Sequence, residues 1–391
     1  MTSKNNKIER VLTKGVEMIY PNQEALRELL VSGKKITLYQ GFDPTGPDLH
    51  IGHGAGLLKL KQFQDLGHEV IILVGDFTAM IGDPTDKTAA RQVLTEEEVK
   101  KNLENWQGQL EKILDLSKTR IVYNSQWLKN VGLSELINWT SKVTVGQMLE
   151  RDMFERRLKT GKPIYLHEFL YPLLQGYDSV FLGVDLEVGA SDQTFNMLMG
   201  RTMMKTLDRE KMVLTLKLLE DPVSGKKMGK TEGNMVTLND PPNEMYGRVM
   251  SWPDEIMPLA FELCTEFDRE EVEKVTAGHP RDAKMTLARE IVSLYHGYEQ
   301  AKQAEQWFQE TFQDKKTPES EIPEVRVKSG DRIGEVLLTA GLVRSKSDWR
   351  RLVDQKAVTV LPEEKITDPD QVATENMTLK LGKKKFIKIK V

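Results

Sequence analysis

The first half of the chain alternates short apolar runs with amphipathic segments. Residues 36–39 form a short apolar run that predicts a strand, and residues 70–74 form a second, continuous run between two glycines. Apolar residues recur at helical spacing over 51–66, which predicts a helix between these strands. A continuously apolar strand is typical of a parallel sheet covered on both faces. The alternation therefore predicts a Rossmann-like, doubly wound α/β domain over residues 1–240.

The pattern changes near residue 241 to helices without strands, and residues 241–314 are expected to form an α-helical domain. Residues 315–330 are rich in Pro, Glu and Lys and are expected to form a linker. A small α+β module, 331–391, follows with 13 Lys/Arg against 9 Asp/Glu. Its end, 383–390, alternates apolar and basic residues, which predicts a strand with one cationic face.

Composition narrows the class of protein. The 391 residues carry a formal charge of −4, so any contact with nucleic acid must come from local basic patches. The single cysteine, Cys264, cannot form an internal disulfide, which fits a reducing cytosol. No apolar run approaches the roughly 20 residues of a membrane span, and the polar opening segment does not resemble a signal peptide. We therefore expect a cytoplasmic protein.

The sequence His50-Ile-Gly52-His53 opens the helix that follows the first predicted parallel strand. Unpaired N–H groups and the helix dipole favour a phosphate at such a position. The two histidines share a helix face and could hold a triphosphate, while Gly52 would let a nucleotide approach the backbone. The alternatives are an ordinary helix start or a metal site, although a third ligand at standard spacing is missing. The glycines that follow do not match G-x-G-x-x-G.

A second basic segment, Lys226-Lys-Met-Gly-Lys-Thr231, follows the predicted strand 212–216. Glycines in and around it suggest a mobile loop whose lysines could close over a pyrophosphate leaving group. The alternative is a solvated basic turn. The segment is not a P-loop, because the G-x-x-x-x-G-K-[ST] spacing fails.

A polar stripe lies within the apolar segment 170–178. Tyr171, Gln175 and Asp178 are spaced i, i+4 and i+7, which places them on one face of a helix. Polar groups in an apolar setting need partners. A bound amino acid would supply them, and a self-satisfied structural network is the alternative.

Taken together, these motifs resemble a known family. The order HIGH and then KMGKT is similar to the two signatures of class I aminoacyl-tRNA synthetases, with Gly229 and Thr231 replacing the serines of KMSKS. Further motifs resemble tyrosyl-tRNA synthetases of bacterial type: Tyr39-x-Gly41-Phe-Asp43-Pro-Thr45, Gly82-Asp83-Pro84, Tyr171-x3-Gln175-x2-Asp178 and Ser191-Asp192-Gln193. The resemblance runs from about residue 30 to 240, with departures at Gln40, Gly56 and Ala190.

The resemblance implies a role for each matching residue. Tyrosine would be bound by Tyr39, Asp83, Tyr171, Gln175, Asp178 and Gln193. ATP would be bound by Gly41, His50, Gly52, His53, Asp192 and Lys230. Catalytic roles would belong to Asp43, Thr45, His50, His53, Lys87, Arg91, Lys227, Lys230 and Thr231. Tyr39 and Asp178 would meet the substrate phenol, and phenylalanine would leave the buried Asp178 unpaired.

The same resemblance implies partners. The enzyme would use L-tyrosine, ATP and tRNA, with Mg²⁺ carried on the ATP phosphates and no metal bound by the protein itself. Residues 115–165 resemble an inserted segment at a dimer interface, which implies a homodimer, and 241–314 would contact the anticodon region. Residues 331–391 resemble an S-four-type RNA-binding domain, in which Lys346, Arg350 and Arg351 share a helix that starts at Ser345.

Three other functions remain open. A tryptophanyl enzyme shares the fold, but Tyr39 and Asp178 favour a phenol. A HIGH-type nucleotidyltransferase without a tRNA step would leave the module 331–391 without a use. A non-catalytic RNA-binding descendant would carry degraded signature motifs, and neither motif is degraded here.

Overall fold

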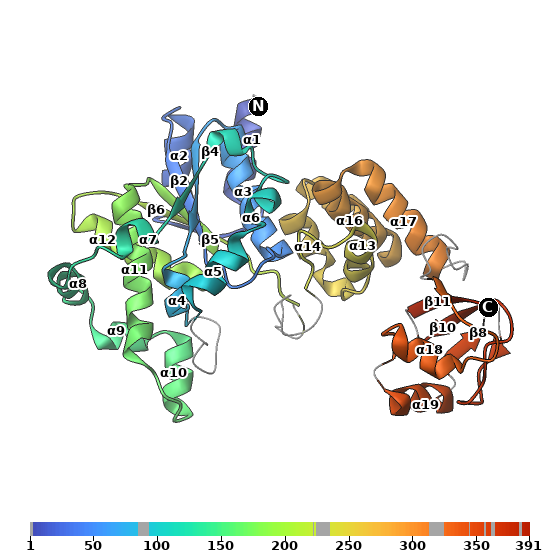
Figure 1. The fold of residues 1–391 in the computed structure, drawn as a ribbon. Helices are drawn as coiled ribbons and strands as arrows, with labels where there is room; N and C mark the ends of the chain where they lie inside the picture. Colours follow the sequence, from blue (N-terminus) through green and yellow to red (C-terminus); the bar gives the residue numbers. More distant parts are fainter. Residues whose placement is uncertain are drawn as a thin grey trace. The chain divides into compact units, whose positions relative to one another are not determined.

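A six-stranded sheet forms the centre of the first part of the chain in the computed structural model, in the order β1-β6-β5-β2-β3-β4 (Figure 1). Its strands are β1 (Val16–Tyr20), β2 (Thr37–Phe42), β3 (Glu69–Val74), β4 (Thr119–Tyr123), β5 (Leu186–Ala190) and β6 (Met212–Leu216). Strands β2 to β6 pair in parallel, and β1 pairs antiparallel with β6 at one edge. The predicted Rossmann-like α/β fold is confirmed.

The structure describes residues 3–84, 94–221, 223, 235–312, 324–343, 345–355, 357–360, 364–382 and 385–391. The chain divides into two units, Met1–Gln306 and Trp307–Val391. The expected boundary at residue 240 falls inside the first unit, so a separate helical domain over 241–314 stays a prediction. Within the described residues, no helix is long and apolar enough to span a membrane.

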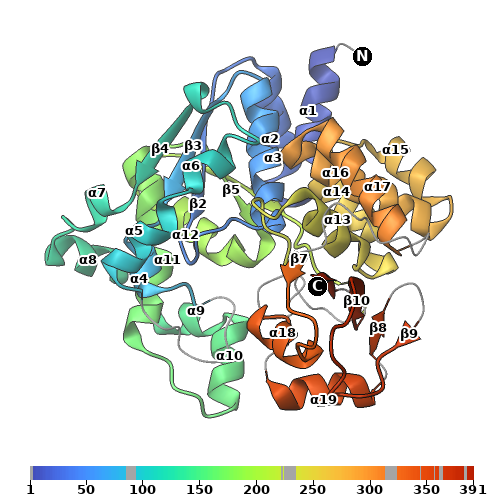
Figure 2. The same cartoon turned by 45° about the vertical axis from the view of Figure 1, so that its right-hand side comes forward.

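Helices cover both faces of the sheet, which explains why β3 is apolar from Val70 to Val74. Those between β1 and β6 in the chain are α2 (Gln23–Val31), α3 (Ile51–Asp65), α4 (Thr78–Ile81), α5 (Glu96–Leu103), α6 (Trp106–Leu110), α7 (Ser125–Leu128), α8 (Leu133–Thr140), α9 (Val145–Leu149), α10 (Asp152–Lys159), α11 (Leu166–Leu182) and α12 (Thr194–Lys205). The helix α1 (Ser3–Thr13) precedes β1. Helix α3 packs on β2, β3 and β5. Figure 2 shows α11 and α12 on the side of the sheet away from α3.

Two glycines bring α11 and α12 close together. A Cβ at Gly176 would lie 2.7 Å from Met203 Sδ and 3.2 Å from the backbone nitrogen of Gly200. A Cβ at Gly200 would lie 2.5 Å from Lys211 Nζ and 2.7 Å from Ser179 Oγ. Because glycine lacks this atom, the two helices can approach until their backbones nearly touch.

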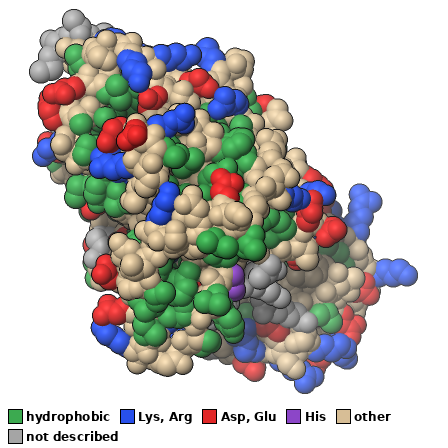
Figure 3. Space-filling view, turned by 90° about the vertical axis from the view of Figure 1, so that its left-hand side faces the viewer, with side chains coloured by type: hydrophobic (Ala, Val, Ile, Leu, Met, Phe, Trp, Pro, Cys, Tyr) green, Lys and Arg blue, Asp and Glu red, His purple; other side chains and the backbone are tan. Residues whose placement is uncertain are grey.

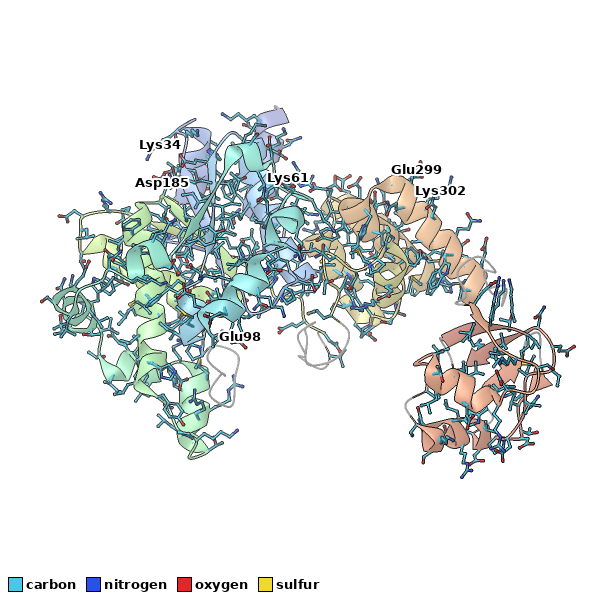
Figure 4. The ribbon with its side chains drawn as sticks, in the orientation of Figure 1. Lys34, Lys61, Glu98, Asp185, Glu299 and Lys302 are labelled. Carbon is cyan, nitrogen blue, oxygen red and sulfur yellow. The ribbon has the colours of Figure 1, made fainter. Side chains whose placement is uncertain are left out.

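Polar contacts connect the amino ends of strands β2 and β5. The Thr37 N–H donates to Asp185 Oδ2 at 2.9 Å, and Lys34 forms an ion pair with Asp185 at 3.2 Å. Figure 4 labels Lys34 and Asp185 close together there. These contacts join the beginnings of β2 and β5, so the two strands run side by side toward their carboxyl ends.

The segment expected to be an insertion, 115–165, is in part a core element. Its residues 119–123 form β4, which pairs with β3 from Val70↔Thr119 to Val74↔Tyr123. The prediction was therefore wrong for this stretch. The run Thr-Arg-Ile-Val-Tyr is only half-buried because β4 lies at the sheet edge, so its sequence is less apolar than that of β3.

Helices alone follow β6 within the described part of the first unit, as predicted. They are α13 (Pro242–Met250), α14 (Met257–Cys264), α15 (Arg269–Thr276), α16 (Pro280–His296) and α17 (Tyr298–Phe312), the last of which contains the division between the two units. Cys264 is fully buried at the end of α14, and burial raises the pKa of its thiol to about 12. The cysteine is therefore structural.

The second unit contains a five-stranded sheet in the order β7-β11-β10-β8-β9. Its elements are β7 (Glu324–Arg326), α18 (Ile333–Thr339), α19 (Lys346–Asp354), β8 (Val358–Val360), β9 (Glu364–Lys365), β10 (Met377–Leu381) and β11 (Lys385–Lys390). Its core includes Ile333, Leu337, Trp349, Leu379 and Ile387. Trp349 is buried and donates its indole N–H to the Pro369 carbonyl at 2.7 Å, so it packs in the core.

Part of the expected linker is also a structural element. Residues 324–326 form β7, which pairs in parallel with β11 through Val325↔Ile389. The linker prediction over 315–330 was wrong for this stretch. The strand was not predicted because the neighbours of Val325 are polar and only Val325 packs against the core.

Candidate active site

A cavity of about 370 Å³ opens at the carboxyl ends of β2 and β5, where the strand order reverses. Doubly wound sheets bind ligands at this switch point. The cavity wall contains every described residue that was predicted to bind tyrosine or ATP or to act in catalysis: Tyr39, Gly41, Asp43, Thr45, His50, Gly52, His53, Asp83, Tyr171, Gln175, Asp178, Asp192 and Gln193. Motifs spread over 155 residues of sequence thus meet around one space of the size that small-molecule sites have.

The first end of the cavity is the beginning of α3. His50 is the N-cap residue, and its Nδ1 accepts the N–H of His53 at 3.4 Å. In return, His53 Nδ1 accepts the N–H of His50 at 3.2 Å, and the two rings stack 3.7 Å apart. Nδ1 of each ring is therefore held by a backbone N–H group, which fixes the orientation of both rings.

Gly52 has a second use that the sequence did not suggest. A Cβ at this position would lie 3.0 Å from Cε1 and 3.1 Å from Nδ1 of the His50 ring. The glycine therefore makes room for the ring that caps its own helix.

Among the described residues, no cluster of three or more His, Cys, Asp or Glu side chains could hold a metal.

Asp43 lies between the two ends of the cavity and is held from both sides. Thr78 Oγ1 donates to its Oδ1 at 2.7 Å, and the Tyr171 hydroxyl donates to its Oδ2 at 2.8 Å. A Cβ at Gly75 would lie 2.0 Å from Asp43 Oδ1, so only glycine allows this approach. Burial and the nearby carboxylates Asp43 and Asp83 raise the Tyr171 pKa well above its usual value, so the phenol stays protonated.

The second end of the cavity is buried. The polar stripe Tyr171, Gln175 and Asp178 lies on α11 and faces the cavity, as the spacing predicted. Asp178 is 2% exposed and accepts from Trp127 Nε1 at 2.8 Å and from Asn124 Nδ2 at 3.3 Å. Burial raises the pKa of Asp178, while these two hydrogen bonds lower it.

Tyr39 joins a buried polar network at this end. Its hydroxyl lies 2.8 Å from Ser179 Oγ, and Lys211 Nζ donates to the same Oγ at 2.7 Å. Lys211 also forms an ion pair with Glu187, whose other oxygen accepts from Gln175 Nε2 at 3.0 Å. Lys211 and Glu187 are 0% and 2% exposed.

Sequence reasoning missed Trp127, Asn124, Ser179, Glu187 and Lys211. Two of them carried a readable signal. Glu187 interrupts the apolar strand β5, and Lys211 directly precedes the apolar strand β6. A charge within a buried strand needs a partner, so the two together could have predicted a buried ion pair.

Part of the cavity wall is formed by Asp192 and Gln193 of η2 (Ser191–Gln193). Gln193 Nε2 donates to Asp83 Oδ2 at 2.7 Å, and Asn196 donates to Gln193 Oε1 at 3.0 Å. The pair Asp83 and Gln193 therefore joins segments that are 110 residues apart in the chain.

The departures from the family pattern at Gln40 and Gly56 are structurally linked. A Cβ at Gly56 would lie 2.4 Å from Gln40 Oε1 and 2.5 Å from Gln40 Nε2. The carboxamide of Gln40 thus fills the space that a side chain at position 56 would need. A hydroxyl residue at 56 and a glutamine at 40 exclude one another in this conformation.

Five predicted residues lie outside the described residues: Lys87, Arg91, Lys227, Lys230 and Thr231. The described residues next to these segments reach the cavity. Asp83 lines it before the first segment, and Leu218 and Leu219 line it before the second. After the second segment, Thr237 forms a β-bridge with His50. Described residues on both sides of the basic segment therefore lie beside the cavity.

The predicted RNA-binding residues lie in the second unit, on α19. Ser345 caps this helix by accepting the Asp348 N–H at 3.1 Å, as its sequence predicted. Lys346, Arg350 and Arg351 are all exposed. Lys346 pairs with Glu335 at 2.9 Å and Arg351 with Asp348 at 2.6 Å, so acidic neighbours moderate the basic face.

Comparison with known proteins agrees with this geometry. The family described as tRNA synthetases class I (W and Y) matches residues 32–313, and the chain therefore belongs to that family. The relatives it resembles are tyrosine enzymes. The tyrosine–tRNA ligase of Moorella thermoacetica is 44% identical over 394 residues, covering 97% of this chain and 95% of the relative. That of Aquifex aeolicus is 42% identical over 385 residues, covering 97% of each chain.

Solved structures support the fold. The crystal structure of a C-terminally truncated mitochondrial tyrosyl-tRNA synthetase from Aspergillus nidulans matches with a TM-score of 0.66 at 23% identity. The match covers 78% of this chain and 94% of that one.

Proposed function

We propose that this protein, an ATP-dependent tyrosine–tRNA ligase, holds its two small substrates at opposite ends of the one cavity. Tyrosine would lie at the buried end beside Tyr39 and Asp178, and ATP at the start of α3 beside His50 and His53. The observation that carries this assignment is that all four side chains line the same space. The tyrosine carboxylate would then attack the α-phosphorus, releasing pyrophosphate, and the tyrosyl group would pass to tRNA.

The buried end suits a phenol. Burial raises the pKa of Asp178, and the N–H groups of Trp127 and Asn124 oppose this effect by favouring the ionised carboxylate, the form that could accept the phenol hydrogen. Tyr39 would contact the phenol oxygen from the other side. The phenylalanine ring offers neither a hydrogen-bond donor nor an acceptor. Its binding would therefore leave the buried Tyr39 hydroxyl and Asp178 carboxylate without a partner from the substrate.

The middle of the cavity suits the amino and carboxyl groups. Asp83, Tyr171 and Gln175 would surround the α-ammonium, for which Asp83 supplies the opposite charge. Gln193 already bonds Asp83, which supports its place beside the carboxyl group. Asp43 would lie near the reacting atoms, where Thr78 and Tyr171 hold it in one position.

The α3 end suits a nucleotide. Gly41 and Asp192 would bind the ribose, Gly52 would admit the nucleotide to the backbone, and Thr45, His50 and His53 would face the phosphates. Lys87, Arg91, Lys227, Lys230 and Thr231 would stabilise the departing pyrophosphate. Mg²⁺ would arrive on the ATP phosphates as part of the substrate.

We also propose a homodimer, formed by helices α8 to α11. Exposed apolar side chains gather on these helices: Leu133 (72% exposed), Ile137 (57%), Val145 (64%), Leu158 (53%), Leu166 (82%) and Phe181 (54%). Figure 3 views the side of the molecule on which α8 and α10 lie and shows clusters of hydrophobic side chains there. Exposed apolar patches of this kind mark protein interfaces.

The second unit would bind tRNA as an S-four-type domain, through Lys346, Arg350 and Arg351. Residues 241–314 would contact the anticodon region, and the enzyme would work in the cytoplasm. The exposed basic face of α19 supports the tRNA contact.

Tyrosine-dependent exchange between ATP and pyrophosphate tests the proposal. We expect exchange with tyrosine and little or none with tryptophan or phenylalanine. Exchange that is faster with tryptophan would assign the buried end to an indole, and exchange that needs no amino acid would favour a simple nucleotidyltransferase. Charging of tRNA in the same preparation tests the second step.

A further inference from the structure

Beneath the tyrosine end of the cavity lies a buried polar network to which no role has yet been assigned. Lys211, Glu187 and Ser179 belong to it, and each is at most 2% exposed. Lys211 directly precedes β6, Glu187 lies on β5, and Ser179 lies on α11 one residue after Asp178. Gly200 of α12 leaves the space that Lys211 Nζ occupies.

The hydrogens on Lys211 can be counted. Three acceptors surround its Nζ: Ser179 Oγ at 2.7 Å, the Met197 carbonyl at 3.0 Å and Glu187 Oε2. An ammonium group has three donors and no acceptor, so it can donate to all three of these oxygens at once. Burial lowers the pKa of Lys211, and Glu187 raises it. Each of the three hydrogens on Nζ therefore forms a hydrogen bond, and one of these bonds is to Ser179 Oγ.

The hydrogen on Ser179 follows from this. Its hydroxyl can donate to Tyr39 at 2.8 Å or to Glu187 Oε2 at 3.3 Å. The contact to Tyr39 is the shorter, and Glu187 Oε2 already accepts from Lys211. Ser179 therefore accepts from Lys211 and donates to Tyr39.

The hydrogen on Tyr39 must then point elsewhere. Burial and the carboxylates of Glu187 and Asp178 raise its pKa well above the usual value, so the hydroxyl keeps its proton. The side chain of Tyr39 lines the cavity. Glu187 is the competing acceptor for this proton, and Lys211 weakens its pull by pairing with its Oε2, so that the Tyr39 O–H can turn toward the cavity.

We propose that Lys211, acting through Ser179, is a positioning residue that directs the Tyr39 hydroxyl toward the phenol oxygen of bound tyrosine. Asp178 then accepts the phenol hydrogen. The phenol group of bound tyrosine would thus accept one hydrogen bond from Tyr39 and donate one to Asp178. Glu187 holds Lys211 in place and, through its other oxygen, also holds Gln175. The inference rests on the proposed tyrosine site.

The variant Ser179→Ala tests this with the least disturbance, because it keeps the Lys211–Glu187 ion pair and removes only the hydroxyl between Lys211 and Tyr39. We expect kcat/KM for tyrosine in ATP–pyrophosphate exchange to fall about threefold to tenfold, the range for one hydrogen bond. The kcat/KM for phenylalanine and the KM for ATP should not change. Thr202→Ala is the matched control, since its hydroxyl is exposed and bonds only Leu198 of its own helix.

A second pair of variants separates positioning from packing. In a Tyr39→Phe background, Ser179→Ala should have no further effect on tyrosine, because the hydroxyl it positions is already absent. An equal fall for tyrosine and phenylalanine, or an undiminished effect in the Tyr39→Phe background, would overturn the inference. If Tyr39→Phe alone left the preference for tyrosine over phenylalanine unchanged, the tyrosine site itself would be wrong, and the inference with it.

Discussion

The two ends of the cavity are built in different ways. At the tyrosine end, Asp178, Tyr39, Lys211 and Glu187 are all buried, and each has hydrogen-bond partners within the protein. At the end proposed to bind phosphate, the described groups are the first turn of α3 and the two stacked histidines, His50 and His53. On the proposed assignment, selection among amino acids would use groups that are fixed before binding, whereas charge stabilisation would use a helix start and cationic side chains.

The largest expected effect concerns stability at the tyrosine end. Lys211→Met leaves the Glu187 carboxylate buried without its cation, which should lower the free energy of unfolding by about 3–5 kcal/mol. Lys211→Met with Glu187→Gln removes both charges and should restore most of the loss. Denaturant unfolding measures both variants. A loss below about 1 kcal/mol in the single variant would mean that this end is less tightly constrained than proposed.

At the phosphate end the expected loss falls on the rate. His53→Ala removes a group that would stabilise the triphosphate in the transition state, so kcat for pyrophosphate exchange should fall about 10²- to 10³-fold. Tyrosine binding, measured by equilibrium dialysis, should stay within about twofold of wild type because the two ends are separate. His50→Asn is a companion variant, since asparagine keeps the N-cap while removing the ring. A loss of tyrosine affinity in either variant would contradict the division into two ends.

Asp178→Asn should weaken tyrosine selection. The amide NH2 would replace one of the two oxygens that accept from Trp127 and Asn124, and the remaining amide oxygen would accept the phenol hydrogen less well than a carboxylate. We expect kcat/KM for tyrosine to fall about 10- to 100-fold, while the value for phenylalanine changes little. An equal fall for both amino acids would indicate misfolding of the site and not lost recognition.

The same carboxylate predicts a pH dependence. Burial raises the Asp178 pKa, so its protonated form persists to a higher pH than that of an ordinary aspartate. A protonated Asp178 cannot accept the phenol hydrogen, and kcat/KM for tyrosine should therefore rise with pH as the group ionises. The acidic limb should lie above the usual range for aspartate and be absent from Asp178→Asn. A limb that persists in that variant must belong to another group.

The smallest effect is expected outside the cavity. Arg350→Gln removes one exposed cation from α19, so the affinity for tRNA should fall a few-fold, and the salt dependence of binding should lose about one unit of slope. Pyrophosphate exchange should not change, because this residue lies in the second unit. Binding titrations at several salt concentrations measure the slope, and an unchanged slope would exclude a phosphate contact at Arg350.

Much of the fold and part of the site could be predicted from local patterns. The strand 212–216 and the helix at 51 are local features, and the stripe Tyr171, Gln175 and Asp178 follows from helical spacing alone. Local patterns could suggest a buried ion pair for Glu187 and Lys211, but they could not show where in the fold the two residues meet. They are 24 residues apart and meet because β5 and β6 pair in register, with Glu187 opposite Val213.

The sequence also failed to predict two strands at the edges of the sheets. The strands β4 and β7 lie at sheet edges, where one side of the strand has no neighbour in the sheet. Such strands need few apolar residues, so the family resemblance assigned β4 to an insertion and composition assigned β7 to a linker. The dual use of Gly52 and the pairing of Gln40 with Gly56 also required coordinates, because each depends on contacts between side chain and backbone.

The burial of Cys264 has a practical consequence. It is the only cysteine in the sequence, and with a pKa of about 12 its thiol will not react readily with maleimides near neutral pH. A cysteine introduced on the exposed face of α19 would then be the single labelling position. A fluorophore attached there could report tRNA encounter without prior removal of a native thiol.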